Sequence, residues 1–460
     1  MPSIVKINVT ETQAPVPNNL QSRGALISQG ATTLAAGTYA LLTQASNLTP
    51  SLNAPLALTS LVWSAGSVTA TSVAAIAGLV TGDTFITTVA GATPNGFNGM
   101  ALATVTGPNT FTYPLQSNPG AETVAGTYTP PNVGELQAAV NTIFAQGGTQ
   151  AVSVLELGAS DETTGPPLLQ NFISANPNWF YVYLVPKSWD GSAAFLALQA
   201  QYQAPSAKTY FFTTTTIGTY TAYTPQMKCV LAAVEAPNLP LGEFSLAADF
   251  QHVLSYAPSP TNKMTPNAFA QLFGVTPYPT QNNNNLLTAL QTAKINYVAT
   301  GAEGGEPQSN IMWQGKTLDG KDFAWWYSAD YIQINIDLDC ANAVFVGSQD
   351  PSNPLVYNQD GIDRLQDVAI ARIQRAISSL LANGTVTRTT LDPHTFTQNL
   401  ENGVYAAQNV VNAVPFNTYV QENPDDYSNE LYAGFTIVYI PQNGFTQIVF
   451  NITVTNLLTA

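Results

Sequence analysis

The chain has 460 residues, which is enough for two to four domains with hydrophobic cores of their own. Only 9% of the residues are Asp, Glu, Lys or Arg, against roughly 25% in ordinary domains, and the formal net charge is -15. The acidic balance argues against a nucleic-acid partner. Few charges combined with 45% hydrophobic residues favour a subunit whose surface is mostly covered in an assembly.

Cysteine usage and hydropathy do not indicate a secreted or membrane protein. Cys229 and Cys340 form no Cys-x-x-Cys motif and are expected to be buried free thiols. The N-terminus lacks the basic and apolar regions of a secretory signal, and the most apolar tract, 56–80, is interrupted by Ser and Thr. The sequence therefore predicts a soluble protein that is made in a cytoplasm and does not insert into a membrane.

The first residues alternate between apolar and polar side chains. Val5, Ile7 and Val9 fall on one face of an extended chain. A Pro-rich spacer, 14–19, follows and cannot pair as a central strand. A strand on such a tether can complete its own sheet or add to the sheet of a neighbouring subunit, and the pattern leaves both possibilities open.

A module of different texture is expected between Leu58 and Pro130, after strands and turns in 25–39. Its only charged residues are Asp83 and Glu122. Turn signals separate short β-type segments at 67–71, 83–87, 102–106 and 110–113. The pattern predicts a small all-β domain, and its turn-rich string resembles a β-domain that recurs as an insertion in phage structural proteins.

From Gly134 onward, helical and strand signatures alternate. Helices are expected at 135–144, 168–174, 192–203 and 245–254, and strands at 152–155, 179–185 and 209–214. This alternation predicts an α/β layer with a parallel sheet. Such sheets often bind ligands at the carboxyl ends of their strands, where this sequence has Glu156, Asp161, Glu162, Lys187 and Asp190. The sequence contains no Gly-x-Gly-x-x-Gly motif and no P-loop.

Five short motifs follow one another between residues 245 and 384. They are Ser-Leu-Ala-Ala at 245–248, Leu-x-Gly-Val-x-Pro at 272–277, Leu-x-x-x-Lys-x-Asn-Tyr at 290–297, Asp-Tyr-Ile at 330–332, and Tyr-Asn-x-Asp-Gly-Ile-x-x-Leu at 357–365. The last motif opens a long amphipathic helix. This order resembles the contractile tail sheath proteins of long-tailed, myovirus-type bacteriophages. The resemblance covers roughly residues 134–384 and, less specifically, both chain ends.

The resemblance implies a multidomain fold of the α+β and α/β classes. A sheath-type core would carry strand-exchange arms at both ends and a small inserted all-β domain. The implied parts are an N-terminal arm 1–20, the start of the sheath domain 21–57, the inserted domain 58–130 on the outer surface, the α/β sheath domain 131–310, an inner core domain 311–440 facing the tail tube, and a C-terminal arm 441–460.

The C-terminal segment alternates as the N-terminal one does. Ile448, Phe450, Ile452 and Val454 fall on one face, and β-branched residues are frequent throughout. The resemblance implies that both terminal strands leave the subunit and pair with the sheets of neighbours.

The function implied by the resemblance is structural and virion-bound. Subunits would form a helical homo-oligomer, with hexameric rings around the tail tube protein, and would also meet baseplate and tail terminator proteins. Contraction would drive the tube through the host envelope for genome ejection. Heterologous contacts that do not close generate helical assemblies of this kind. No enzyme activity and no cofactor are implied.

The segment 330–346 fits two secondary structures. Its strict alternation predicts a strand. A helical stripe also fits, and the sheath family has a helix at this place, so we expect a helix. The stripe consists of Tyr331, Ile334, Leu338, Ala341 and Phe345.

A second helix is expected over 361–381, with a C-terminal stop at Asn383-Gly384. Its apolar stripe contains Ile362, Leu365, Ala369, Ile373, Ala376 and Leu380. Four of the five arginines lie on it or just beyond, namely Arg364, Arg372, Arg375 and Arg388. They could pair with the acidic tail 392–430 of the same or a neighbouring subunit. They could instead face an acidic tube, and the resemblance favours this role.

No catalytic or metal site is predicted. His252 and His394 have no second His or Cys at metal-binding spacing. Asp337 and Asp339 could share a face if extended, as in glycan hydrolysis, but a solvated face is favoured. The aromatic run 325–327 could bind sugar, although core or interface packing is favoured. Two alternatives therefore stay open: a phage adhesin or baseplate protein that binds a host glycan, and a secreted glycan hydrolase.

Overall fold

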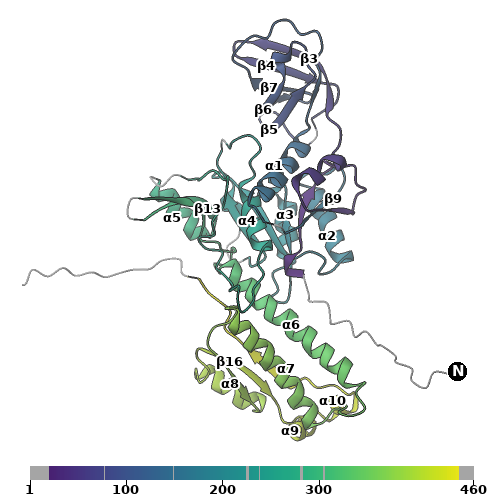
Figure 1. The fold of residues 1–460 in the computed structure, drawn as a ribbon, viewed down its shortest axis with the longest axis vertical. Coiled ribbons are helices and arrows are strands. Elements are labelled where there is room, and N and C mark those ends of the chain that lie inside the picture. Colours follow the sequence, from purple (N-terminus) through teal and green to yellow (C-terminus); the bar gives the residue numbers. More distant parts are fainter. Residues whose placement is uncertain are drawn as a thin grey trace, which may run out of the picture. The chain divides into compact units, whose positions relative to one another are not determined.

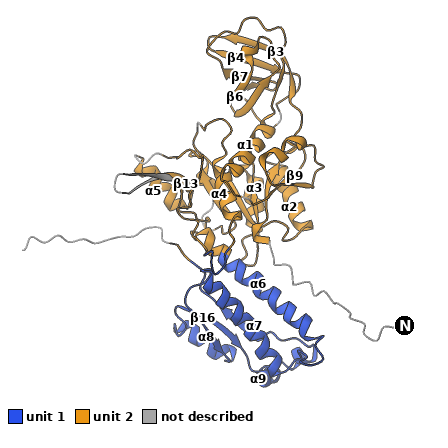
Figure 2. Cartoon of the chain, in the orientation of Figure 1, with its two compact units in different colours: residues 1–19, 258–263, 328–442 blue, residues 20–257, 264–327, 443–460 orange. Residues whose placement is uncertain are grey.

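The structure, a computed structural model, describes residues 20–76, 78–148, 150–223, 227–237, 239–279, 283–303 and 306–444. The terminal strands predicted around Val5, Ile7 and Val9 and around Ile448, Phe450, Ile452 and Val454 therefore lie outside the described residues. The described chain divides into a sheet unit, 20–257 with 264–327 and 443–444, and a helical unit, 258–263 with 328–442 (Figure 2). The boundary expected at 310/311 falls inside a strand, and the units divide instead at 327/328.

The sheet unit is built on eight strands in the order β14-β13-β12-β11-β10-β1-β9-β2. These are β1 Gly24–Ser28, β2 Tyr39–Leu42, β9 Val152–Glu156, β10 Val182–Leu184, β11 Tyr210–Thr215, β12 Val230–Val234, β13 Asn296–Glu303 and β14 Glu306–Trp313. Figure 1 labels β9 and β13 of this sheet. The strands from β13 to β9 run parallel, and the edge strands β2 and β14 pair antiparallel to their neighbours. The predicted parallel sheet is confirmed.

Helices cover both faces of this sheet. They are α1 Pro131–Ala145, α2 Gly165–Ala175, α3 Ala193–Ala200, α4 Ser245–Leu254 and α5 Asn284–Ala293. Neighbouring residues of a strand point to opposite faces. Phe211 contacts Phe195 of α3, whereas Phe212 contacts Phe250 of α4. Burial on both faces explains why β9, β11 and β12 are buried along their whole length.

The module predicted between Leu58 and Pro130 is a closed barrel in the order β3-β4-β7-β6-β5-β8. Its strands are β3 Leu56–Ser64, β4 Ser67–Ser72, β5 Thr84–Ala90, β6 Gly99–Gly107, β7 Thr110–Pro114 and β8 Thr127–Tyr128. Phe97, Phe111 and Tyr128 fill its core and are almost fully buried. Closure removes exposed strand edges, which suits a small module with little charge.

The helical unit contains most of α6 Phe323–Gly347, followed by α7 Gln359–Ser378, α8 Pro393–Glu401, α9 Phe416–Glu422 and α10 Pro424–Ser428. A three-stranded sheet has the order β15 Thr385–Thr389, β16 Gln408–Ala413 and β17 Phe435–Val438. The amide of Gln366 ties α7 to this sheet, because it donates to the carbonyl oxygens of Thr389 and Val411, both at 2.8 Å.

The segment 330–346 lies inside α6, so the expected helix is confirmed and the alternating pattern is misleading here. The predicted end of the next helix is wrong. α7 ends at Ser378, and Leu380 adopts a positive φ of 56°. The N–H of Leu381 bonds to the carbonyl of Ala376, and the N–H of Leu380 bonds to that of Ile377. This is a Schellman motif built without glycine, and it leaves Leu380 exposed rather than in the apolar stripe.

Candidate functional sites

The order in which the chain adds strands to the sheet reverses between β1 and β10. After β1 the chain adds β9 on one side, and then crosses over to add β10 on the other. Open α/β sheets bind ligands at such a switch point. A cavity of about 830 Å³ opens here, lined by the ends of β1 and β10, the first turns of α1, the loop before α2 and barrel residues including Tyr128.

The chemistry of this cavity does not suit a phosphorylated ligand. Helix N-termini bind phosphate through free backbone N–H groups. Here α1 begins at Pro131, and α2 has Pro166 and Pro167 in its first turn, so these positions have no N–H to offer. Asp161 also lines the cavity, and hydrogen bonds from Thr164 and Thr163 lower its pKa, so it adds negative charge.

Glu156, predicted at the end of β9, is completely buried. Its carboxylate accepts hydrogen bonds from the hydroxyl of Ser28 (2.6 Å), the N–H of Gly30 (2.7 Å), the hydroxyl and N–H of Thr32 (2.7 and 3.1 Å), and the N–H of Gly158 (2.7 Å). Both oxygens are occupied by the chain's own donors. The carboxylate therefore organises the loop that follows β1.

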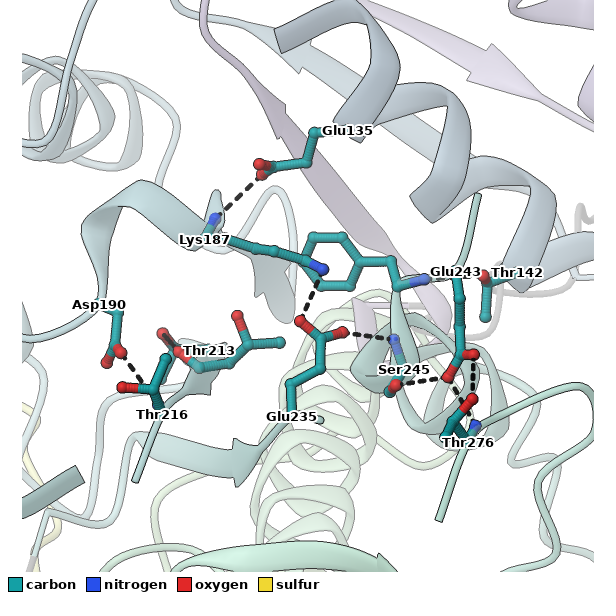
Figure 3. Close-up of polar contacts among 12 residues, drawn as sticks. Glu135, Thr142, Lys187, Asp190, Thr213, Thr216, Glu235, Glu243, Ser245 and Thr276 are labelled. Atoms are coloured by element: carbon teal, nitrogen blue, oxygen red, sulfur yellow. Dashed lines mark hydrogen bonds and ion pairs between the residues drawn. The ribbon is translucent and has the colours of Figure 1, made fainter. Parts of the chain in front are cut away.

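Lys187 connects three elements at the same edge of the sheet (Figure 3). Its ammonium lies 2.6 Å from Glu235, just after β12, and 4.6 Å from the centre of the Phe244 ring. Its backbone N–H donates to Glu135 of α1 at 3.0 Å, and Glu235 accepts the N–H of Ser245 at the start of α4 at 2.8 Å. Burial raises the pKa of Glu135, and the nearby Lys187 charge acts in the opposite direction.

The other carboxylates at this edge hold neighbouring loops. Glu243 accepts from the hydroxyl of Ser245 at 2.7 Å, and from the N–H and hydroxyl of Thr276, both at 2.6 Å. Asp190 accepts from Tyr223 at 2.8 Å and from the N–H of Thr216 at 3.2 Å. The side chains of Glu135, Lys187, Asp190, Glu235 and Glu243 thus form a network, the polar clasp, that joins segments of one unit.

The sequence pattern predicts Lys187 and Asp190 at this edge but not Glu135, Glu235 and Glu243. Glu235 directly follows the fully buried strand β12, and Glu156 is the last residue of the fully buried strand β9. The same signal could therefore have found it. Of the predicted edge residues, Asp161 accepts from the N–H groups of Thr163 and Thr164 in its own turn. Glu162 is exposed.

The predicted carboxylate pair is not formed. Residues two apart on a helix point in nearly opposite directions, so Asp337 and Asp339 of α6 do not share a face. In the aromatic run, Trp326 and Tyr327 are buried, and the indole N–H of Trp326 donates to Asp319 at 2.9 Å. The run therefore belongs to the core, and neither feature supports the hydrolase alternative.

The remaining candidate residues have ordinary structural environments. Burial lowers the pKa of His252 to about 4, so this ring is neutral at pH 7. His394 lies in the first turn of α8. Cys229 is buried and Cys340 half-buried, both as free thiols. Within the described ranges, no three His, Cys, Asp or Glu residues are placed to hold a metal ion. None of the helices described combines the length and apolar character that a membrane span requires.

Of the four predicted arginines, three bond to other residues of the helical unit and one is exposed without an ion pair among the described residues. Arg372 makes a bidentate pair with Asp339 of α6, at 2.7 and 2.9 Å, and its side chain is 12% exposed. Arg388 pairs with Asp363 at 2.9 Å and with Asp367 at 2.6 Å. Arg364 donates to the carbonyls of Asn353 and Pro354, at 3.2 and 3.3 Å.

Arg375 is exposed on α7 and makes no ion pair with another described residue. The ion-pair partners of Arg372 and Arg388 lie on α6 and α7 rather than in the acidic tail 392–430. Arg375 is therefore the member of the cluster best placed to meet another molecule.

Comparison with known proteins finds no matching family model and no matching curated protein. Among solved structures, the chain is similar to the sheath tail protein of Listeria innocua, with 11% identity and a TM-score of 0.35, over 78% of this chain and 85% of that one. It is also similar to the helical sheath of the anti-feeding prophage in the contracted state. There the identity is 11% and the TM-score 0.45, over 99% of this chain and 100% of that one.

Proposed function

We propose that this chain is a structural subunit of a contractile tail sheath. Such subunits polymerise helically around a tail tube and contract to drive the tube through the envelope of a host cell. The observation that carries the proposal is the ordered motif series together with the elements that it forms. The segment 330–346 separates the alternatives best, because local alternation favours a strand whereas the sheath resemblance requires a helix, and the segment is helical.

The surface of α6 supports an assembled state. Apolar residues surround this helix rather than forming one stripe, as is typical of helices that are covered on all sides. Near its end, Val344, Phe345 and Val346 are 45%, 68% and 65% exposed. Contiguous exposed apolar residues of this kind mark a protein–protein contact. We infer that other subunits cover this surface in the polymer.

The finer features of the proposal concern the chain ends, the barrel and Arg375. The terminal strands around Val5, Ile7 and Val9 and around Ile448, Phe450, Ile452 and Val454 would pair with sheets of neighbouring subunits. The barrel would lie on the outer surface of the sheath. Arg375 would face an acidic tail tube, as part of the predicted set Arg364, Arg372, Arg375 and Arg388. Baseplate and terminator proteins would bound the polymer in the virion tail.

Electron microscopy of the concentrated, purified protein tests the proposal. We expect negatively stained tubes or rings. The variant Phe345→Asp should prevent their formation, because it places a charge in the inferred contact. Val62→Asp is the matched control, since Val62 of the barrel is similarly exposed (58%) and should tolerate the change. A wild-type protein that remains monomeric at every concentration would contradict the proposal, and equal polymerisation by both variants would exclude the α6 contact.

A further inference from the structure

The first turn of α6 is tied to a preceding loop by one buried carboxylate. Asp322 lies directly before the helix and is 3% exposed. It accepts the N–H of Ala324 at 2.7 Å, which caps the helix. It also accepts the N–H groups of Asn267 and Ala268, at 3.0 and 2.9 Å. Asp322 therefore holds the loop 264–270 and the start of α6 together.

Both ends of the described chain contact the start of α6 or the loop 264–270. At the N-terminal end, the side-chain amide of Gln21 donates to the carbonyl of Tyr327, the fifth residue of α6, at 2.8 Å. At the C-terminal end, a Cβ added to Gly444 would lie 2.6 Å from Cβ of Pro266 and 3.7 Å from the carboxylate of Asp322. The two ends of the described chain, at Gln21 and Gly444, thus contact the same loop and helix start.

A second buried carboxyl group, that of Asp249, bonds to the loop 264–270. Asp249 of α4 is completely buried and accepts from the amide of Asn267 at 3.2 Å. Burial raises its pKa to about 7, and the negative charge of Asp322 acts in the same direction. Burial also raises the pKa of Asp322, against the lowering effect of its backbone donors. Tyr256 and Lys316 are the titratable groups that interact with these carboxyls, and Tyr327 and the neutral His252 pack against Tyr256.

We propose that the start of α6 and the loop 264–270 form a clamp for both ends of the described chain, 20–23 and 443–444, and that proton loss from Asp249 opens the clamp. When Asp249 is protonated, its carboxyl carries no charge and the loop stays bound to Asp322. When it ionises, two buried carboxylates that both bond to Asn267 are charged, and like charges repel strongly in such an environment. The loop then separates from α6, and both ends are released together.

Hydrogen exchange on the full-length chain tests the clamp without requiring assembly. We expect local opening of 20–23, 264–270, 322–327 and 443–444 to increase about tenfold between pH 6 and pH 8, after correction for the intrinsic pH dependence of exchange. Asp249→Asn should remove this increase, because the amide keeps the size of the side chain but does not ionise. Asp337→Asn, at an exposed position of α6, is the control and should behave as wild type.

Two outcomes would overturn the clamp. One is an Asp249→Asn protein that keeps the wild-type pH dependence, and the other is an opening that reaches only one chain end. Gly444→Ala provides a second variant should Asp249→Asn not fold. The added methyl group must displace Pro266, so exchange should rise in 264–270 and also at Gln21, at pH 6. Unchanged exchange at Gln21 in this variant would likewise refute the clamp.

Discussion

The carboxyl edge of the parallel sheet and the α6–α7 face of the helical unit both collect charged residues, but they use them differently. At the edge, Lys187 pairs with Glu235, and Glu235 and Glu243 accept backbone N–H groups of Ser245 and Thr276. These bonds hold neighbouring loops in place. On the helical unit, Arg372 is held by Asp339, whereas Arg375 and the apolar end of α6 remain exposed. Clustered charge in this protein therefore marks the places where the chain binds itself. The end of α6, by contrast, exposes apolar residues to possible partners.

The largest expected effect concerns Glu156, the most completely bonded carboxylate of the sheet edge. Glu156→Ala leaves five donor groups without their acceptor, three of them buried and two part-buried; each buried one is worth roughly 1–3 kcal/mol, although they relax in part. We expect the free energy of unfolding in urea to fall by about 5 kcal/mol. Glu162→Ala, at an exposed position of the same edge, should change it by less than about 0.5 kcal/mol. Similar values for the two variants would remove the distinction between a structural clasp and an ordinary polar surface.

Asp249 differs from the carboxylates of the sheet edge, because no positively charged group among the described residues acts on it within the core. Its pKa is about 7 in the folded chain and about 4 when unfolded, so only the folded chain holds the proton between these values. The free energy of unfolding should therefore decrease as pH rises from about 4 to about 7, by up to about 4 kcal/mol, and then level off. Urea unfolding across this range should show the decrease in wild type and in Asp337→Asn but not in Asp249→Asn. A flat wild-type profile would contradict this assignment.

The smallest expected effect separates the two arginines of α7. Arg372→Met leaves Asp339 partly buried without its partner, and we expect a loss of about 2 kcal/mol in the free energy of unfolding. Arg375→Met removes an exposed charge and should cost less than about 0.5 kcal/mol. Co-sedimentation with the tail tube should show the reverse order, with Arg375→Glu reducing binding. If Arg375→Met destabilised the fold as much as Arg372→Met, its proposed role towards a partner would be lost.

Local sequence pattern was sufficient for most regular elements. The helix predicted at 245–254 is α4 residue for residue, and the β-type segments of the barrel all became strands. These elements are determined by period and turn residues, which are properties of neighbouring positions. The alternation at 330–346 could not decide between helix and strand, because apolar residues surround α6 and any period can be traced through them.

Tertiary structure decided the contacts that join distant segments. The sequence placed Lys187 and Glu156 at strand ends, but it could not show that Glu135 and Glu235, 100 residues apart, would meet at Lys187. Nor could it show that α7 would end at Ser378 and turn at Leu380 without glycine, since the burial of Leu381 accompanies that turn. Periodicity specifies which side of an element is apolar. The partner that covers this side depends on how the whole chain packs.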